Sequence, residues 1–342
     1  MNILFIWVSP DYSFPMSLSS LSSYMKQFGH RTKMTTVIAR TNILHQRDFA
    51  HVRQDIESFK PDICAFTVFE PCWHATKAIC DDIKNHYPHI KNVLGGYFPM
   101  LKPEIVIEHP SVDALCIGEG ENGFPEYCDY LQEKKIASMI PNFWIKEPYI
   151  TSNNQTLTID AIITKNARVG LITALDDLPF PDRECVDFQW YLDLGKPDRS
   201  CKILASRGCP LACTYCSVEK FRSMYPNLPK EYMRFRSVDN VISEIQLLAN
   251  RYDFETIGFH DDNPLSMRKW LLEFCDKYIA IGKPFPFYMA GRPETANVEV
   301  AKRLKDAGCY LILMGLENGD ENMRTKVMNR PMSNKKIFDS FK

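Results

Sequence analysis

Long apolar runs and an excess of one charge are both missing from this chain of 342 residues. No stretch approaches the roughly 20 consecutive apolar residues of a membrane-spanning helix, so we expect no membrane span. The chain has 41 basic and 42 acidic side chains, and its formal net charge of −1 gives no general attraction to nucleic acid. The N-terminus has no basic leader and is typical of a buried strand. We therefore expect a cytoplasmic protein without a nucleic-acid partner.

The paired cysteines of a secreted disulfide framework are lacking as well. Most of the 12 cysteines stand singly in apolar segments, as Cys64, Cys80, Cys116 and Cys275 do. We expect these to be reduced core residues, because a free cysteine behaves as a small apolar side chain.

One compact group of cysteines is the exception. Cys209, Cys213 and Cys216 stand at CxxxCxxC spacing, directly after a short apolar run at residues 203–205. A structural zinc site normally has four ligands, and neither a second cysteine pair nor a His-x-x-x-His follows. Three thiolates can instead hold three irons of a cubane cluster and leave the fourth iron open to a reacting molecule. Zinc or three incidental cysteines stay as alternatives.

This motif, with Tyr215 just before its last cysteine, resembles the signature of the radical S-adenosyl-L-methionine (SAM) superfamily. The resemblance implies a 4Fe-4S cluster whose open iron chelates the amino and carboxylate groups of SAM. One electron would then split the sulfonium and give a 5′-deoxyadenosyl radical. It also implies an electron donor such as flavodoxin or ferredoxin, and radical chemistry carried mainly by the cofactors.

From residue 1 to about 145 the sequence alternates strand-like and helix-like patterns. Such alternation predicts a doubly wound parallel sheet, which is a Rossmann-like α/β domain. The expected strands are residues 3–8, 32–39, 62–69, 92–95 and 112–117. Ligands of these sheets bind at the carboxyl ends of the strands. The candidate residues at that edge are Ser9, Pro10, Thr67, Gly95, Gly96, Gly118, Glu119 and Gly120.

Glycines at this edge either admit a large ligand to the backbone or serve only as turns at positive φ. Their order, however, resembles the cobalamin-binding domain of one radical SAM subgroup. The shared features are a Gly-Gly turn at 95–96, a Pro-Glu helix start at 103–104, and a Val-Asp strand that ends in Gly-Glu-Gly-Glu at 118–121. The resemblance implies cobalamin as a cofactor. The Asp-x-His-x-x-Gly loop that supplies a histidine to cobalt in many cobalamin proteins is absent, so the lower cobalt ligand is unassigned.

Residues 146–200 have a different character. Apolar and polar residues alternate on both sides of the turn-like cluster at 152–155, which predicts a hairpin. The proline-rich run at 176–183 is typical of an extended connector. We expect this region to connect the two cofactor domains.

From residue 201 to 342 the pattern strand, loop, helix repeats four times, which predicts a partial β/α barrel with its strand ends at one mouth. Glu317 lies in a Gly-Leu-Glu-Asn-Gly segment that resembles the family segment whose glutamate binds the ribose hydroxyls of SAM. Arg292 and Arg330 are candidates for pairing with the SAM carboxylate, or are structural cations. The family's barrel usually has six units, so we expect a barrel truncated at its C-terminus that lacks some substrate contacts.

The resemblance as a whole implies a cobalamin-dependent radical SAM enzyme. Our leading hypothesis is methylation of an unactivated carbon in a small-molecule or natural-product substrate. A radical cyclisation or rearrangement would use the same cofactor sites and stays open, as does a non-catalytic cofactor-binding fragment. No catalytic side chain is assigned beyond the cluster ligands. A zinc-linked nucleic-acid module is disfavoured by the charge and by the missing fourth ligand.

Overall fold

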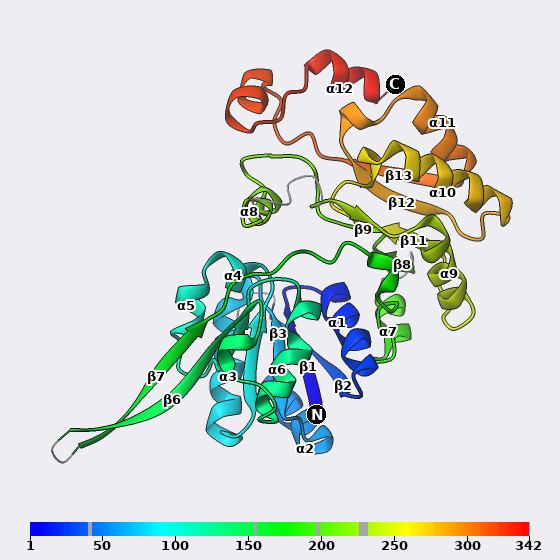
Figure 1. Cartoon of the computed structure of the whole chain (residues 1–342). Helices are drawn as coiled ribbons and strands as arrows, with labels where there is room; N and C mark the ends of the chain where they lie inside the picture. Colours follow the sequence, from blue (N-terminus) through cyan, green and yellow to red (C-terminus); the bar gives the residue numbers. More distant parts are fainter. Residues whose placement is uncertain (40–42, 154–155, 196–198, 226–231, 342) are drawn as a thin grey trace. The chain divides into compact units, whose positions relative to one another are not determined.

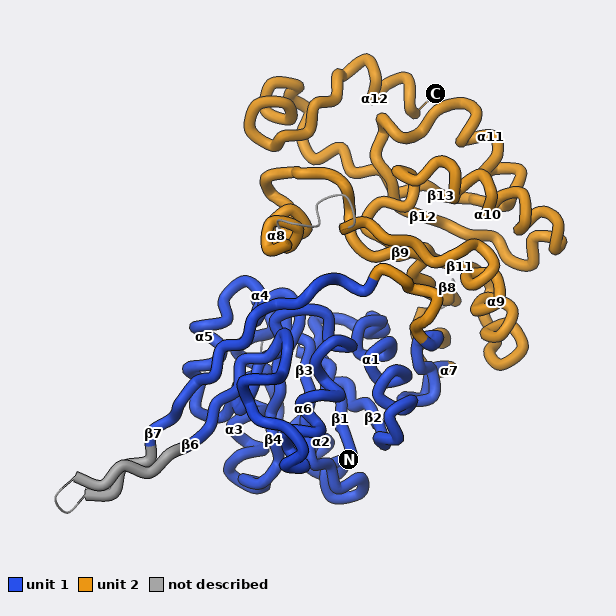
Figure 2. The backbone as a smooth tube through the Cα atoms, in the orientation of Figure 1, with its two compact units in different colours: residues 1–172, 179–188 blue, residues 173–178, 189–342 orange. Residues whose placement is uncertain are grey.

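The computed structural model describes the chain except residues 40–42, 154–155, 196–198, 226–231 and 342 (Figure 1). The chain forms two compact units (Figure 2). Unit 1 comprises residues 1–172 and 179–188, and unit 2 comprises residues 173–178 and 189–342. Each unit contains a sheet with parallel strands.

Five parallel strands form the centre of unit 1, in the order β2-β1-β3-β4-β5. They are β1 (Asn2–Ser9), β2 (Arg31–Ile38), β3 (Ile63–Thr67), β4 (Lys91–Gly95) and β5 (Ala114–Cys116). All five predicted strands are present. The helices of the unit are α1 (Met16–Gln27), α2 (Gln46–Phe59), α3 (Trp73–His86), α4 (Tyr97–Leu101), α5 (Pro103–Ile107) and α6 (Phe124–Leu131).

Helices cover both faces of this sheet. Leu4 and Ile6 of β1 belong to one core with residues of α2, α3 and α5. Ile3 and Phe5, on the opposite face of the same strand, belong to a second core with residues of α1 and α6. Side chains of a strand point alternately to its two faces, so the almost wholly apolar sequence of β1 follows from burial on both sides. The predicted doubly wound architecture is confirmed.

The predicted hairpin is also present, as the antiparallel pair β6 (Phe143–Asn153) and β7 (Thr156–Lys165). Its turn includes residues 154–155, outside the described part of the chain. β6 pairs antiparallel with β5, so the hairpin extends the sheet of unit 1 to seven strands. The pairing of β6 with β5 was not predicted, because an alternating pattern identifies a strand without identifying its neighbour.

Unit 2 is built on four parallel strands in the order β8-β11-β12-β13. These are β8 (Ser200–Ile203), β11 (Thr256–Phe259), β12 (Phe287–Gly291) and β13 (Cys309–Met314), which confirms the four predicted repeats. The helices are α7 (Phe188–Leu194), α8 (Ser217–Ser223), α9 (Val238–Ala249), α10 (Arg268–Ala280), α11 (Val298–Asp306) and α12 (Asn334–Ser340), with a π-helical turn at Met323–Val327. A small antiparallel pair, β9 (Ser206–Arg207) with β10 (Arg234–Phe235), was not predicted.

One face of this four-stranded sheet packs on helices through aromatic side chains. The ring of Phe259 on β11 contacts the rings of Phe274 on α10 and Phe287 on β12 at 5.2 and 5.7 Å between centroids. The N-terminus of α9 is capped, because the Ser237 side chain accepts a hydrogen bond from the Asn240 backbone N–H. Among the helices that the structure describes, none is long and apolar enough to cross a membrane.

Candidate functional site

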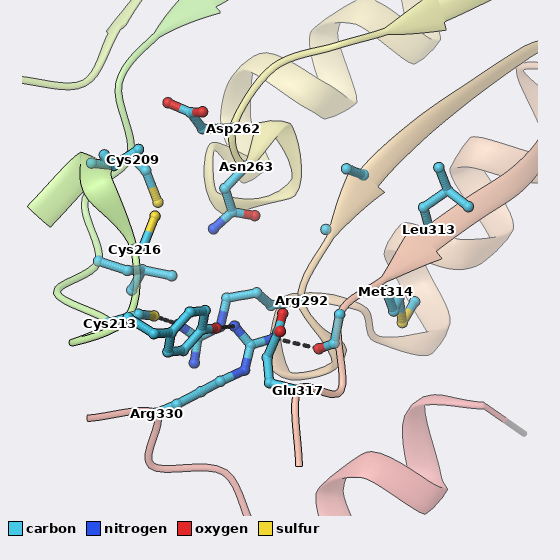
Figure 3. A pocket seen from close by; sticks show the side chains of 16 residues that line it. Cys209, Cys213, Cys216, Asp262, Asn263, Arg292, Leu313, Met314, Glu317 and Arg330 are labelled. Atoms are coloured by element: carbon cyan, nitrogen blue, oxygen red, sulfur yellow. Dashed lines mark hydrogen bonds between the residues drawn. The ribbon is translucent and has the colours of Figure 1, made fainter. Parts of the chain in front are cut away.

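A single pocket in unit 2 brings together seven of the site residues predicted from the sequence (Figure 3). Its volume is about 490 Å³. The predicted residues that line it are Cys209, Cys213, Tyr215, Cys216, Arg292, Glu317 and Arg330. They come from the loop after β9, the end of β12 and the segments after β13, so the carboxyl ends of the parallel strands create the pocket.

The cysteine loop begins at Gly208, a position that no residue with a Cβ can occupy. Gly208 has a φ of +87°, and a Cβ there would collide with the backbone carbonyl oxygen of Tyr232. The sulfur atoms of Cys209 and Cys216 point toward one another, whereas that of Cys213 points toward Arg292 (Figure 3). Burial raises the pKa of the Cys209 thiol.

The three cysteines do not converge on a single point. Within the described residues no group of three His, Cys, Asp or Glu side chains is arranged to hold one metal ion. A zinc ion needs such convergence, but a cubane cluster does not, because each thiolate binds a different iron. The loop offers three thiolates, as a cubane cluster with one open iron requires.

A distant segment holds the cysteine loop in place. The Thr214 backbone N–H donates to the carbonyl of Met328 at 3.2 Å, and its hydroxyl donates to the carbonyl of Val327, 113 residues later, at 2.8 Å. The Asn329 side-chain amide donates to the carbonyl of Ala212 at 2.8 Å. The loop that carries the cysteines is thus fixed by the backbone at the end of the π-helical turn, residues 327–329.

The two arginines make defined contacts in the pocket. Arg292 donates to the Cys213 sulfur at 3.3 Å and pairs with Glu294 at 2.5 Å. Arg330 donates to the Tyr215 hydroxyl at 3.2 Å and also to the carbonyl of Gly315. In both arginines the Nε–H is buried and has no hydrogen-bond partner among the described residues.

Asn263 is a pocket residue that sequence reasoning missed. Only 2% of it is exposed, and both its amide nitrogen and its amide oxygen lack a hydrogen-bond partner among the described residues. A buried amide without partners costs free energy, so a polar molecule in the pocket would relieve this cost. Because the donor and the acceptor lie beside the cysteine loop, the pocket fits a polar cofactor such as SAM. The only sequence signal for Asn263 was its position after two aspartates at the end of a strand.

Two carboxylates near the pocket have unusual surroundings. Asp261 is buried and accepts hydrogen bonds from the Ala205 backbone N–H at 3.0 Å and from the Ser206 hydroxyl. Burial raises the pKa of Asp261 to about 6. These hydrogen bonds connect the end of β11 to the stem of the cysteine loop. Glu317 has a φ of +67°, a strained conformation for a residue other than glycine.

The predicted residues of unit 1 lie at the carboxyl edge of its sheet. Ser9 ends β1, Thr67 ends β3 and Gly95 ends β4, while residues 118–120 follow β5 and Pro10 follows Ser9. Ser9 is buried, and its hydroxyl contacts the Asp11 carboxylate at 3.2 Å. The Glu119 carboxylate accepts a hydrogen bond from the Ile172 backbone N–H at 2.7 Å.

Packing within unit 1 explains three of the glycines at this edge. A Cβ at Gly96, whose φ is +90°, would lie 2.5 Å from the Thr67 hydroxyl oxygen. One at Gly118 would lie 2.5 Å from the Asn142 side chain, and one at Gly120 would lie 3.1 Å from Leu21. The space at these glycines is thus filled by the chain itself, so the turn and packing interpretation accounts for them.

Aromatic side chains at the same edge offer a surface for a flat ligand. Phe69, which follows β3, contacts Trp7 and Tyr97 with ring centroids 5.5 and 5.2 Å apart. Tyr97 is 42% exposed, which is uncommon for a large aromatic side chain of a well-packed unit. Exposed aromatic rings stack on planar rings, so this edge fits a macrocycle such as cobalamin.

Comparison with known families matches both units. The sequence pattern of the B12 binding domain matches residues 6–127, and that of the radical SAM superfamily matches residues 203–342. An uncharacterized methyltransferase of Pyrococcus horikoshii is 26% identical over 306 residues, which cover 89% of this chain and 61% of the relative. An anaerobic magnesium-protoporphyrin IX monomethyl ester cyclase of Rubrivivax gelatinosus is 26% identical over 266 residues, which cover 78% and 44%.

Solved structures share the fold. The cobalamin-dependent S-adenosylmethionine radical enzyme OxsB, with aqua-cobalamin and SAM bound, superposes with a TM-score of 0.73 at 15% identity, covering 98% of this chain and 47% of that one. The radical SAM methyltransferase TsrM of Kitasatospora setae superposes with a TM-score of 0.69 at 17% identity, covering 98% and 64%. This chain therefore spans about half to two thirds of the length of these proteins. With both family domains present in this order, the chain belongs to the radical SAM superfamily, in the subgroup with a cobalamin-binding domain, and its cofactors are a 4Fe-4S cluster, SAM and cobalamin.

Proposed function

We propose that this protein is a cobalamin-dependent radical SAM methyltransferase that methylates an unactivated carbon of a small molecule. The observation that carries the proposal is the pocket in which three cysteines meet Glu317, two arginines and the unpaired amide of Asn263. The name of the Pyrococcus horikoshii relative, a methyltransferase, supports methyl transfer as the outcome.

In this proposal each side chain of the pocket has one task. When bound, the cofactors supply a 5′-deoxyadenosyl radical, by one-electron cleavage of SAM, and a methyl group for transfer. Cys209, Cys213 and Cys216 hold three irons of the cluster. Glu317 accepts hydrogen bonds from the two ribose hydroxyls of SAM, since a carboxylate offers two acceptor oxygens for a diol.

The remaining polar groups orient SAM. Asn263 offers an NH2 donor group and an acceptor oxygen in the same pocket, which suits the amino and carboxylate groups of SAM. Arg292 and Arg330 line the same pocket, and each has a buried Nε–H without a partner among the described residues, so both are candidates to pair with the SAM carboxylate. The Tyr215 hydroxyl accepts a hydrogen bond from Arg330, which holds the tyrosine beside the cysteines.

Unit 1 holds cobalamin at the carboxyl edge of its sheet. Ser9, Pro10, Thr67, Gly95, Gly96, Gly118, Glu119 and Gly120 shape this edge. The exposed ring of Tyr97 adds an apolar contact. A reductant of the flavodoxin or ferredoxin class supplies the electron for SAM cleavage. The 12 free cysteines favour a reducing compartment such as the cytoplasm.

A second candidate function is a radical cyclisation, which the name of the Rubrivivax gelatinosus relative favours. The two can be separated without the natural substrate. Incubating the reconstituted protein anaerobically with cobalamin, reductant and SAM should give S-adenosylhomocysteine if SAM also serves as methyl donor. Formation of 5′-deoxyadenosine without S-adenosylhomocysteine would favour the cyclisation.

A further inference from the structure

Arg324 is a charged side chain that unit 2 buries completely. It lies in the π-helical turn, is 0% exposed, and is the largest of the fully buried side chains among the described residues. Charged side chains are rarely buried to this extent unless they are paired. In the described part of the chain the partners of Arg324 are neutral oxygens. Its guanidinium donates to the carbonyl of Asn318 at 2.6 Å, to that of Met332 at 3.0 and 3.3 Å, and to the side-chain oxygen of Asn334.

The first of these contacts fixes the loop that carries Glu317. We call residues 315–319 the Glu317 loop. The Asn318 carbonyl that Arg324 binds follows directly after Glu317. Glu317 itself has a positive φ, and a Cβ at Gly315 would collide with its carboxylate oxygen, so the carboxylate lies over its own loop. A strained conformation of this kind persists only where the surrounding structure holds it. Arg324 supplies such a contact from inside the unit.

Arg324 is also connected to the support of the cysteine loop. Its backbone carbonyl accepts a hydrogen bond from the Arg330 N–H at 2.8 Å, and the Arg330 guanidinium donates to the Tyr215 hydroxyl at 3.2 Å. The turn that contains Arg324 ends at Val327, whose carbonyl binds the Thr214 hydroxyl. π-Helical turns occur frequently at functional sites. One residue thus joins the Glu317 loop to the segment that holds the cysteine loop.

We propose that Arg324 is a positioning residue that fixes the Glu317 loop relative to the cysteine loop, so that SAM binds through its ribose and through the open iron at the same time. The inference rests on the proposed function, in which Glu317 binds the ribose hydroxyls and the cysteines hold the cluster. A ligand with two attachment points binds tightly when both are held at the right separation, because the second contact is then intramolecular. A fully buried side chain does not touch SAM, so Arg324 acts through the two loops.

The contacts of Arg324 require a guanidinium. All three of its nitrogens donate to backbone carbonyls, in the directions of a rigid planar fork. A lysine ammonium is a single donor atom on a flexible chain and does not reproduce these separate directions. Lysine does keep the positive charge and much of the side-chain volume. Arg324→Lys therefore removes the connection with little disturbance of the surrounding core.

A double-mutant cycle on the reconstituted chain with its cluster tests the proposal, with SAM itself as the probe. Equilibrium dialysis gives the dissociation constant of SAM for wild type, Arg324→Lys, Glu317→Ala and the double variant, at matched iron content. We expect Arg324→Lys to raise the dissociation constant about tenfold when Glu317 is present. It should have little further effect in Glu317→Ala, because the loop then carries no group to position. A purely structural role would give the same fold-change in both backgrounds.

Matched variants make the result specific. Arg268→Lys, at an exposed position of α10, should leave SAM binding unchanged. Asn334→Ala removes a single acceptor of the guanidinium and replaces Arg324→Lys in the cycle if that variant loses its cluster. It should weaken SAM binding several-fold, again only when Glu317 is present.

Two results would overturn the inference while SAM binds normally to the wild-type chain. One is a wild-type dissociation constant in Arg324→Lys or in the variant that replaces it. The other is an equal fold-change with and without Glu317. Failure of SAM to bind the iron-loaded wild-type chain would overturn the proposed function and this inference with it, so the two failures are distinguishable.

Discussion

The guanidinium of Arg292 donates a hydrogen bond to the sulfur of Cys213 at 3.3 Å, so a buried cation contacts the middle cysteine of the cluster motif. Its other nitrogen pairs with Glu294, which fixes the guanidinium in this orientation. Hydrogen bonds and positive charge at a ligating sulfur stabilise the reduced, more negative form of a cluster.

Replacing Arg292 with Met should therefore make the cluster harder to reduce. We expect the midpoint potential to fall by about 60 mV, which corresponds to a tenfold change for one electron. The measurement is a potentiometric titration followed by electron paramagnetic resonance. Glu294→Gln, which removes the negative partner, should raise the potential. An unchanged potential in Arg292→Met at normal iron content would show that the contact does not tune the cluster.

The Asp261 carboxylate predicts a pH dependence of stability. Its pKa is about 6 in the folded protein against 3.8 as the ordinary value, because it is buried. The folded state thus binds the proton more tightly, and the stabilisation it provides is present below pH 4 and lost as the pH rises through 6. Relative to Asp261→Asn, the wild-type protein should lose up to about 3 kcal/mol of unfolding free energy between pH 4 and pH 7.5.

Urea unfolding at several pH values measures this difference. Asp306→Asn, at an exposed position at the end of α11, is the matched control and should follow the wild-type profile. Parallel pH profiles for wild type and Asp261→Asn would mean that the buried carboxyl keeps an ordinary pKa.

The contact between Thr214 and Val327 predicts a kinetic effect on the cluster. Thr214→Val removes the hydroxyl that binds the Val327 carbonyl and keeps the shape of the side chain. The loss of one hydrogen bond costs about 1 kcal/mol, so the cysteine loop should open several times more often. We expect iron release to a chelator to become several-fold faster, while Ser223→Ala on α8 should have no effect. Equal release rates would indicate that the end of the π-helical turn does not hold the loop.

Replacing Glu317 should weaken SAM binding without changing cluster assembly. Glu317→Ala removes both acceptor oxygens, and charge-assisted hydrogen bonds of this kind contribute about 1.5–3 kcal/mol. The dissociation constant of SAM should rise about tenfold or more at unchanged iron content, measured by equilibrium dialysis. Glu299→Ala, an exposed position on α11, serves as control. Unaltered SAM affinity would remove the ribose assignment.

Much of the fold could be predicted because its signals are local. The apolar strands β1 and β3 and the repeats that begin at β8 are visible as short periodic patterns, and Cys209, Cys213 and Cys216 stand within eight residues of one another. Glu317 became a candidate through the resemblance of its Gly-Leu-Glu-Asn-Gly segment to the family, and the structure places it and Arg292 after strand ends, beside the cysteines.

The remaining features depend on contacts between distant residues, which leave no periodic trace. Nothing near Thr214 indicates that its partner is Val327. The unpaired amide of Asn263 and the link from Asp261 to Ala205 become visible only when burial and register are known. The same holds for the pairing of His260 with Tyr288 across two strands.

The most direct test of the account is anaerobic reconstitution of the chain with iron, sulfide and cobalamin, followed by reduction in the presence of SAM and chromatographic assay of 5′-deoxyadenosine. The account predicts that the wild-type chain forms 5′-deoxyadenosine. Cys213→Ala should form none and still bind cobalamin, while Cys275→Ala in the core of α10 should behave as wild type. Absence of 5′-deoxyadenosine from an iron-loaded wild-type chain, or its undiminished formation by Cys213→Ala, would contradict the central claim.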